Sequence, residues 1–223
     1  GLDTPWGEAD VKAAAAAGPD AVLVTKVSSP ADVERADGLL ASADPRTRLW
    51  IMMETPLAIL DARAIAAQAL RPRSRLACLV LGTNDLVKET RAVLDPERTA
   101  ALFWLSAVLT AGRAFGLDVL DGVYNNFRDT DGYLRECQHG RSLGMDGKTL
   151  IHPDQIAMAN TVFAPSAEEV VDARGIIAAF EEPQNKGKGA ITYKGRMVEI
   201  LHAVMAQRTV AVAQAIAQRE GSA

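Results

Sequence analysis

The chain has 223 residues, of which 48% are hydrophobic and 23% are charged, an ordinary composition for a globular protein with a substantial core. Its formal net charge of −4 provides no basic field, which argues against a nucleic-acid-binding surface. No apolar run approaches the roughly 20 residues that a membrane span needs, and no signal peptide opens the chain, so we expect no membrane partner.

Strands and helices alternate along the first 160 residues. In chain order we expect a helix at 9–17, a strand at 20–27, a helix at 30–42, a strand at 49–53, a helix at 56–70, a strand at 76–81, a helix at 99–115, a strand at 117–123, a helix at 131–143 and a strand at 146–151. Such alternation predicts a parallel sheet wrapped by helices. Right-handed crossovers then bring the C-terminal ends of all strands to one edge of the sheet.

The pattern changes after His152 and Pro153. We expect helices at 154–160 and 167–180, a short strand-like stretch at 190–193, and a long amphipathic helix at 197–216. These elements divide the chain into a partial (β/α) barrel at 1–160 and a C-terminal helical extension and arm at 161–223. The two cysteines have no metal-ligand spacing, and Cys78 within an apolar strand indicates a buried thiol in a reducing cytoplasm.

Two expected strands each stop at a carboxylate. Glu54 follows the apolar run at 49–53, and Asp85 follows the run at 76–81 after Gly82, Thr83 and Asn84. Because neighbouring parallel strands end at the same edge, these acids could form a hard oxygen site suited to Mg²⁺. The alternative is that Asn84 or Asp85 caps a helix at 86–93 and that Glu54 is a solvated loop acid.

Seven stretches of the chain, in this order and spacing, resemble the citrate lyase beta-subunit-like enzymes, which include malyl-CoA lyases. They are LDTPWG at 2–7, VTKV at 24–27, ETP at 54–56, LGTNDL at 81–86, LDGVY at 120–124, GMDGKTLIHPDQI at 144–156 and GAITYKGRMVE at 189–199. The resemblance implies a TIM (β/α)₈ barrel, of which this chain would lack about the first three strands and the family's substrate-binding arginine.

The same resemblance implies a carbon–carbon lyase in which Glu54 and Asp85 are the two protein ligands of Mg²⁺. The expected partners are an acyl-CoA and a 2-oxo acid, and the leading reaction is the cleavage of citryl-CoA to acetyl-CoA and oxaloacetate. One alternative is the cleavage of malyl-CoA or methylmalyl-CoA to glyoxylate. Another is a non-catalytic relative that acts as an assembly subunit. A metal-dependent pyruvate aldolase, which uses no CoA, fits the C-terminal extension less well.

Two further residues gain expected roles from the resemblance. Glu199 stands where lyases of this group usually carry a catalytic aspartate, although it could instead be a solvated residue in the first turn of a helix. Lys26, at a strand end, could contact the acidic substrate or the CoA phosphates, or could simply extend into solvent.

We also expect a homo-oligomer, a trimer or hexamer. The flexible stretch at 187–189 and the amphipathic helix at 197–216 have no obvious place on the barrel of their own chain. A parallel sheet of five units would also leave an exposed edge that another segment must cover.

Overall fold

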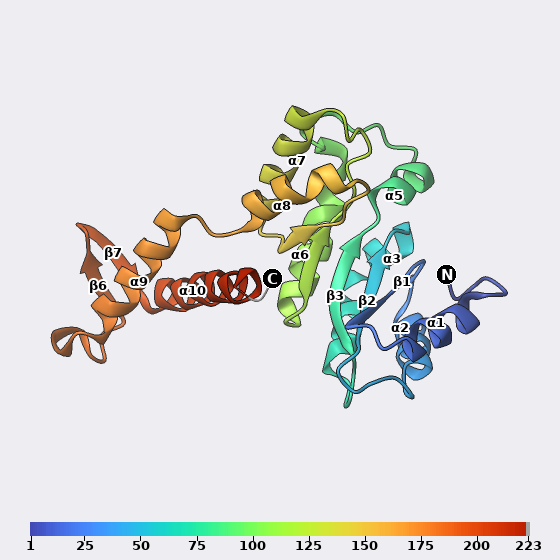
Figure 1. Ribbon diagram of the computed structural model, residues 1–223, viewed down its shortest axis with the longest axis horizontal. Helices are drawn as coiled ribbons and strands as arrows, with labels where there is room; N and C mark the ends of the chain where they lie inside the picture. Colours follow the sequence, from blue (N-terminus) through green and yellow to red (C-terminus); the bar gives the residue numbers. More distant parts are fainter. Residues whose placement is uncertain (222–223) are drawn as a thin grey trace. The chain divides into compact units, whose positions relative to one another are not determined.

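The computed structural model describes residues 1–221 and contains two compact units, which divide after Ala159. We call residues 1–159 the N-terminal unit and the remainder the C-terminal unit. Figure 1 shows the course of the chain through both.

The N-terminal unit is built on a parallel sheet whose strands lie side by side in sequence order. Its strands are β1 (Ala21–Val24), β2 (Arg48–Met53), β3 (Leu76–Leu81), β4 (Asp118–Asp121) and β5 (Gly147–Lys148). Every neighbouring pair is parallel, with Ile51 opposite Leu79 and Leu120 opposite Gly147. The expected α/β fold is therefore confirmed, and its sequential strand order is that of consecutive units in a (β/α)₈ barrel.

Helices connect the strands and pack on the sheet: α2 contacts β2, α6 contacts β3 and β4, and α7 contacts β5. They are α1 (Gly7–Ala16), α2 (Pro30–Leu39), α3 (Pro56–Leu60), α4 (Ala62–Ala66), α5 (Thr83–Thr90), α6 (Leu102–Ala114) and α7 (Thr130–Leu143), with α8 (Ile156–Phe163) at the boundary of the two units. Short 3₁₀ turns are η1 (Ala67–Leu70), η2 (Thr99–Ala101) and η3 (Pro153–Gln155).

Along β2, buried side chains alternate with more exposed ones, which shows how the sequence forms the core. Leu49, Ile51 and Met53 are fully buried, whereas the residues between them are only half-buried. In β3, by contrast, consecutive residues from Cys78 to Leu81 are buried, so this strand is covered on both faces. The strand ends of β2 and β3 are consequently held by buried core residues.

Several expected elements are shorter than their sequence patterns. The first strand ends at Val24, two residues before Lys26 adopts a left-handed φ of 58°. The expected strand at 146–151 pairs only at Gly147–Lys148. The helix expected at 56–70 divides at Asp61, whose φ of −97° and ψ of 12° leave the helical region.

The helix expected at 86–93 is displaced toward the N-terminus. It is α5, which begins at Thr83 with Gly82 at its N-cap and ends where Arg91 turns left-handed, at a φ of 59°. The interpretation of Asn84 or Asp85 as an N-cap is therefore wrong. Asp85 lies in the first turn of the helix, where the helix dipole favours a negative charge.

The C-terminal unit consists of two helices and a hairpin. Its elements are α9 (Ala167–Glu181), η4 (Pro183–Asn185), β6 (Ala190–Tyr193), β7 (Arg196–Glu199) and α10 (Ile200–Glu220). Residues 197–199 were expected to begin the last helix, but they belong to β7, which pairs with β6 through a turn at Lys194 and Gly195, both with positive φ. The small core of the unit joins Ala173 and Ile176 of α9 to Ala206 of α10.

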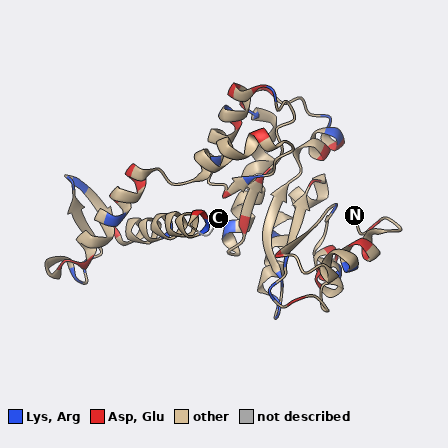
Figure 2. Cartoon of the chain, viewed as in Figure 1, with Lys and Arg blue, Asp and Glu red and all other residues tan. Residues whose placement is uncertain are grey.

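Helix α10 corrects the expectation that no segment reaches the length and hydropathy of a membrane span. It has 21 residues, and an 18-residue window within it has a mean hydropathy of 1.3. Alanine and valine raise this value despite interspersed polar residues, and Figure 2 shows how sparse charged side chains are along the helix. Length and composition alone are weak evidence for a membrane span, because helices of soluble proteins also meet them.

Candidate metal centre

Three neighbouring strands of the N-terminal unit bring Lys26, Glu54 and Asp85 together at their C-terminal ends. Lys26 follows β1, Glu54 follows β2, and Asp85 follows β3 in the first turn of α5. Since β1, β2 and β3 are adjacent in the sheet, residues 28 and 31 positions apart in sequence become neighbours. The expected meeting of the two acids is a direct consequence of strand order.

Glu54 is the buried member of the pair, with only 3% of its surface exposed. Its Oε1 accepts a hydrogen bond from the backbone N–H of Lys26 over 2.8 Å. Burial raises the pKa of Glu54 above its ordinary value, and the hydrogen bond from Lys26 offsets part of this rise. Glu54 is therefore not a solvated loop acid, which was the alternative from the sequence.

Asp85 is the more accessible member, with a side chain that is 34% exposed. Its Oδ1 accepts a hydrogen bond from Nζ of Lys26. This contact lowers the pKa of Asp85 below its ordinary value, despite partial burial. Each carboxyl group also contributes to the pKa shift of the other, and Lys26 contacts both, so the two acids share one site. We call these two residues the carboxylate pair.

Polar contacts between neighbouring loops hold the carboxylate pair in place. The hydroxyl groups of Ser28 and Thr55 lie 2.8 Å apart and join the segments after β1 and β2. The backbone N–H of Gly82 donates to the carbonyl oxygen of Met53 over 3.1 Å, which carries the β2–β3 pairing to the end of both strands. Such contacts preorganise the pair before any ligand arrives.

The donor atoms of the carboxylate pair fit Mg²⁺. Carboxylate oxygens are hard ligands, and Mg²⁺ is commonly held by one or two of them, with waters and substrate oxygens completing its shell. Within residues 1–221 no group of three or more histidine, cysteine or acidic side chains could hold a metal. The pair thus matches the expected two protein ligands rather than an all-protein cage.

Comparison with known proteins agrees with this geometry. Residues 1–153 match the model of the HpcH/HpaI aldolase/citrate lyase family. The chain belongs to this family. The resemblance inferred from the sequence motifs is thereby confirmed. The expectation of an enzyme from this lyase family is also confirmed, since its relatives carry the names of enzymes.

Two curated relatives and one solved structure represent the matches. A (3S)-malyl-CoA thioesterase from Cereibacter sphaeroides is 48% identical over 217 residues, which cover 97% of this chain and 73% of that protein. The citrate lyase subunit beta of Leuconostoc mesenteroides is 33% identical, covering 96% and 72% respectively. The CitE protein of Mycobacterium tuberculosis, solved with magnesium, acetoacetate and coenzyme A, is 25% identical with a TM-score of 0.71, covering 95% and 75%.

Glu199, the expected catalytic residue, belongs to the C-terminal unit, whereas the carboxylate pair belongs to the N-terminal unit. It ends β7 in the C-terminal unit and is the N-cap of α10, where its backbone N–H donates to Nδ1 of His202 over 2.9 Å. Its catalytic role remains a prediction. The contact of Lys26 with CoA or substrate also remains a prediction, since the structure shows the lysine engaged with the carboxylate pair.

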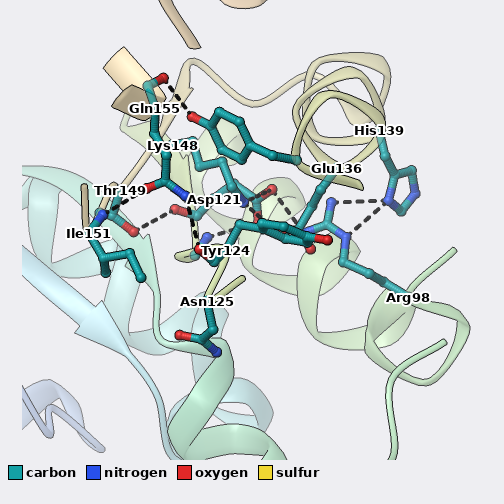
Figure 3. Close-up of polar contacts among 12 residues, drawn as sticks. Arg98, Asp121, Tyr124, Asn125, Glu136, His139, Lys148, Thr149, Ile151 and Gln155 are labelled. Atoms are coloured by element: carbon teal, nitrogen blue, oxygen red, sulfur yellow. Dashed lines mark hydrogen bonds and ion pairs between the residues drawn. The ribbon is translucent and has the colours of Figure 1, made fainter. Parts of the chain in front are cut away.

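A buried ion network near the ends of β4 and β5 was missed by the sequence analysis. Figure 3 shows Arg98 and Lys148 converging on Asp121, with Glu136 beside Lys148. Nη1 of Arg98 lies 2.8 Å from both carboxylate oxygens of Asp121, and Nζ of Lys148 lies 3.1 Å from one of them. Burial alone would raise the pKa of Asp121, but the charges of Lys148 and Arg98 outweigh it and lower that pKa. Both oxygens of Asp121 are committed to these cations, so we assign the network a structural role.

His139 and His152 have structural partners. Nδ1 of His139 accepts from Nε of Arg98 over 3.2 Å, and burial lowers the pKa of His139. His152 accepts the N–H of Asp154 and stacks on Phe127 with ring centroids 4.5 Å apart. His152 is thus held by a local hydrogen bond and by ring stacking.

Proposed function

We propose that this chain is a magnesium-dependent enzyme that hydrolyses the thioester of (3S)-malyl-CoA or a closely related 3-hydroxyacyl-CoA. The observation that carries the choice of substrate is the 48% identity with a (3S)-malyl-CoA thioesterase across 97% of the chain. The carboxylate pair, whose two acids both contact Lys26, is our candidate for the metal ligands in this reaction. The cytoplasmic location expected from the sequence is part of this proposal.

Each group has a defined task in the reaction. Glu54 and Asp85 hold Mg²⁺, which when bound acts as a Lewis acid toward substrate oxygens. The first N–H groups of α5 have no partner within the helix, so they could donate hydrogen bonds to negative charge that develops on the substrate. A water molecule adds to the thioester carbonyl carbon, the C–S bond breaks, and the thiolate takes up the proton that the water loses. Glu199 is our candidate for the group that takes this proton from the water and passes it on to the thiolate.

The second candidate is the carbon–carbon lyase reaction on citryl-CoA, favoured by the 33% identity with a citrate lyase beta subunit. A base removes the proton of the 3-hydroxyl group, and the adjacent C–C bond breaks to give oxaloacetate. The electron pair remains in the thioester enolate, which is protonated to acetyl-CoA. Cleavage of malyl-CoA to glyoxylate follows the same steps. Glu199 in place of the usual aspartate is the sequence feature that disfavours the lyase reactions.

One assay separates these reactions. The purified protein is incubated with malyl-CoA and with citryl-CoA, with and without Mg²⁺, while free thiol and 2-oxo acid are measured separately. We expect magnesium-dependent thiol release from malyl-CoA with no glyoxylate. Release of a 2-oxo acid would establish a lyase instead. Absence of turnover with both esters at every Mg²⁺ concentration would favour a non-catalytic assembly subunit.

The C-terminal unit supports a homo-oligomer in this proposal. Exposed apolar side chains, including Met197 of β7 and Met205 of α10, line a groove of about 910 Å³ between α9, β7 and α10. Exposed apolar surface of this kind normally marks a contact site, and its proposed occupant is a second copy of this chain in a trimer or hexamer. Light scattering after size-exclusion chromatography is expected to show that oligomer. A clean monomer, or binding to lipid vesicles in a flotation assay, would contradict it.

A further inference from the structure

Lys26 contacts both members of the carboxylate pair through two different groups. Its backbone N–H donates to Oε1 of Glu54, and its Nζ forms an ion pair with Oδ1 of Asp85. The side chains of Lys26 and Asp85 are 35% and 34% exposed, so their ion pair lies at the edge of solvent. One lysine therefore connects the two acids that would hold the metal.

The backbone of Lys26 is shaped for this double contact. Its φ of 58° is left-handed, a conformation that a residue with a Cβ adopts at a cost and that persists only where the surroundings impose it. Directly after β1, this turn points the N–H group at Glu54 while the side chain reaches Asp85. A lysine that merely extended into solvent would need neither the turn nor the ion pair.

The ammonium group and a divalent ion compete for the same carboxylate. Mg²⁺ requires near-octahedral oxygen ligands at a distance of about 2 Å, which leaves no room for an ammonium group on the same oxygen atom. The backbone N–H of Lys26 carries no net charge, so its contact with Glu54 can persist when the metal binds. The ammonium group is a cation, and on the carboxylate of Asp85 it would stand close to the divalent ion and be repelled by it. The contact of Nζ with Asp85 is therefore the interaction that metal binding is expected to break.

We propose that Lys26 exchanges partners during the reaction cycle. Metal binding displaces its ammonium group from Asp85, and the released charge then binds a carboxylate of the acid substrate next to the metal. This inference rests on the proposed magnesium-dependent function and adds the assignment of Lys26 as a residue that tunes metal affinity and binds the acid. It makes two predictions of opposite sign for one substitution, which a purely structural lysine would not.

The test uses calorimetric titration of Lys26→Met, first with Mg²⁺ and then with malate at saturating Mg²⁺. Removing the ion pair is expected to tighten Mg²⁺ binding by about fivefold, which is the size of effect that a partly exposed ion pair has on an equilibrium constant. Loss of a charge-assisted hydrogen bond is expected to weaken malate binding by about tenfold. Because the backbone of Lys26 is left-handed, Lys26→Asn is a second variant suited to that conformation if Lys26→Met folds poorly.

Two control variants make each outcome decisive. Lys88→Met removes a positive charge that also acts on Asp85 without contacting it, and is expected to change both affinities much less. Mg²⁺ binding no tighter than in Lys88→Met, or malate binding no weaker, overturns the exchange. Glu54→Gln tests the metal site itself: unchanged Mg²⁺ affinity in that variant would overturn the proposed function, whatever Lys26→Met shows.

Discussion

Gly82 lies directly against Glu54: a Cβ built on Gly82 would fall 2.3 Å from the Cβ of Glu54 and 2.9 Å from its Oε2. Real side-chain contacts never come this close, so only glycine allows the end of β3 to approach the buried acid at the end of β2. The same residue is the N-cap of α5, which carries Asp85. Gly82 therefore sets the positions of both members of the carboxylate pair.

Gly82→Ala is expected to displace Glu54 and to lower Mg²⁺ affinity about ten- to a hundredfold, the usual effect of disturbing a residue that positions a metal ligand. Calorimetric titration with Mg²⁺ measures this change. Gly38→Ala in α2 is the matched control, because a Cβ there meets nothing within 4 Å. Equal Mg²⁺ affinity in the two variants would show that Gly82 does not position the pair.

The ion network around Asp121 predicts a large loss of stability in Asp121→Asn. The substitution keeps the shape of the side chain but leaves the buried cations Arg98 and Lys148 without their shared carboxylate. Breaking a buried pair in this way costs about 3 kcal/mol in free energy of unfolding, measurable by urea denaturation. Glu8→Gln, which breaks an ion pair with Arg35 whose side chains are both 48% exposed, is expected to cost much less. Similar losses in both variants would contradict the structural role of the network.

We expect the folded protein to lose stability in mild acid because of His139. Burial, followed by the charge of Arg98, lowers its pKa below the ordinary 6.5, so the folded protein binds a proton there less readily than the unfolded chain. The contribution of His139 to the free energy of unfolding is fully present above about pH 6.5. It is lost as the pH falls from there to the lower pKa that His139 has in the folded protein.

Urea denaturation at a series of pH values measures this dependence. In His139→Gln, which has no titratable ring, the free energy of unfolding is expected to fall less steeply with acid than in the wild type. His202→Gln serves as the control, since that histidine lies in the C-terminal unit. A pH dependence unchanged by His139→Gln would show that His139 does not cause the loss of stability in acid.

Cys78 is predicted to be unreactive in the folded protein. Burial raises the pKa of its thiol to about 12, and only 1% of the residue is exposed, so both the thiolate and access are lacking at neutral pH. Labelling with iodoacetamide, followed by mass spectrometry, is expected to modify Cys78 only after denaturation. Rapid labelling of the native protein would indicate that β3 opens readily.

The carboxylate pair could be predicted from sequence because strand ends are local features. Each apolar run ends visibly at Glu54 or Asp85, and parallel strands necessarily end at one edge of the sheet. The same reasoning placed Lys26 at that edge. Its contact with Asp85 could not be predicted, because it depends on a left-handed backbone at a lysine, which sequence patterns do not indicate.

The network of Arg98, Asp121 and Lys148 was missed for a different reason. Its members come from the N-cap of η2, from β4 and from β5. Arg98 and Lys148 lie 23 and 27 positions from Asp121, and no motif in the sequence links the three residues. One signal was available: Asp121 ends a strand in the same way as Glu54 does. The start of α10 was misplaced because the residues of β7 fit a helix equally well until their pairing with β6 is known.

The central claim is that Glu54 and Asp85 together hold one Mg²⁺ ion. Calorimetric titration of the wild type and of the double variant Glu54→Gln/Asp85→Asn with Mg²⁺ tests it most directly, with circular dichroism verifying that both proteins are folded. We expect one Mg²⁺ site per chain in the wild type and none in the folded double variant. Unchanged Mg²⁺ affinity in the double variant would contradict it.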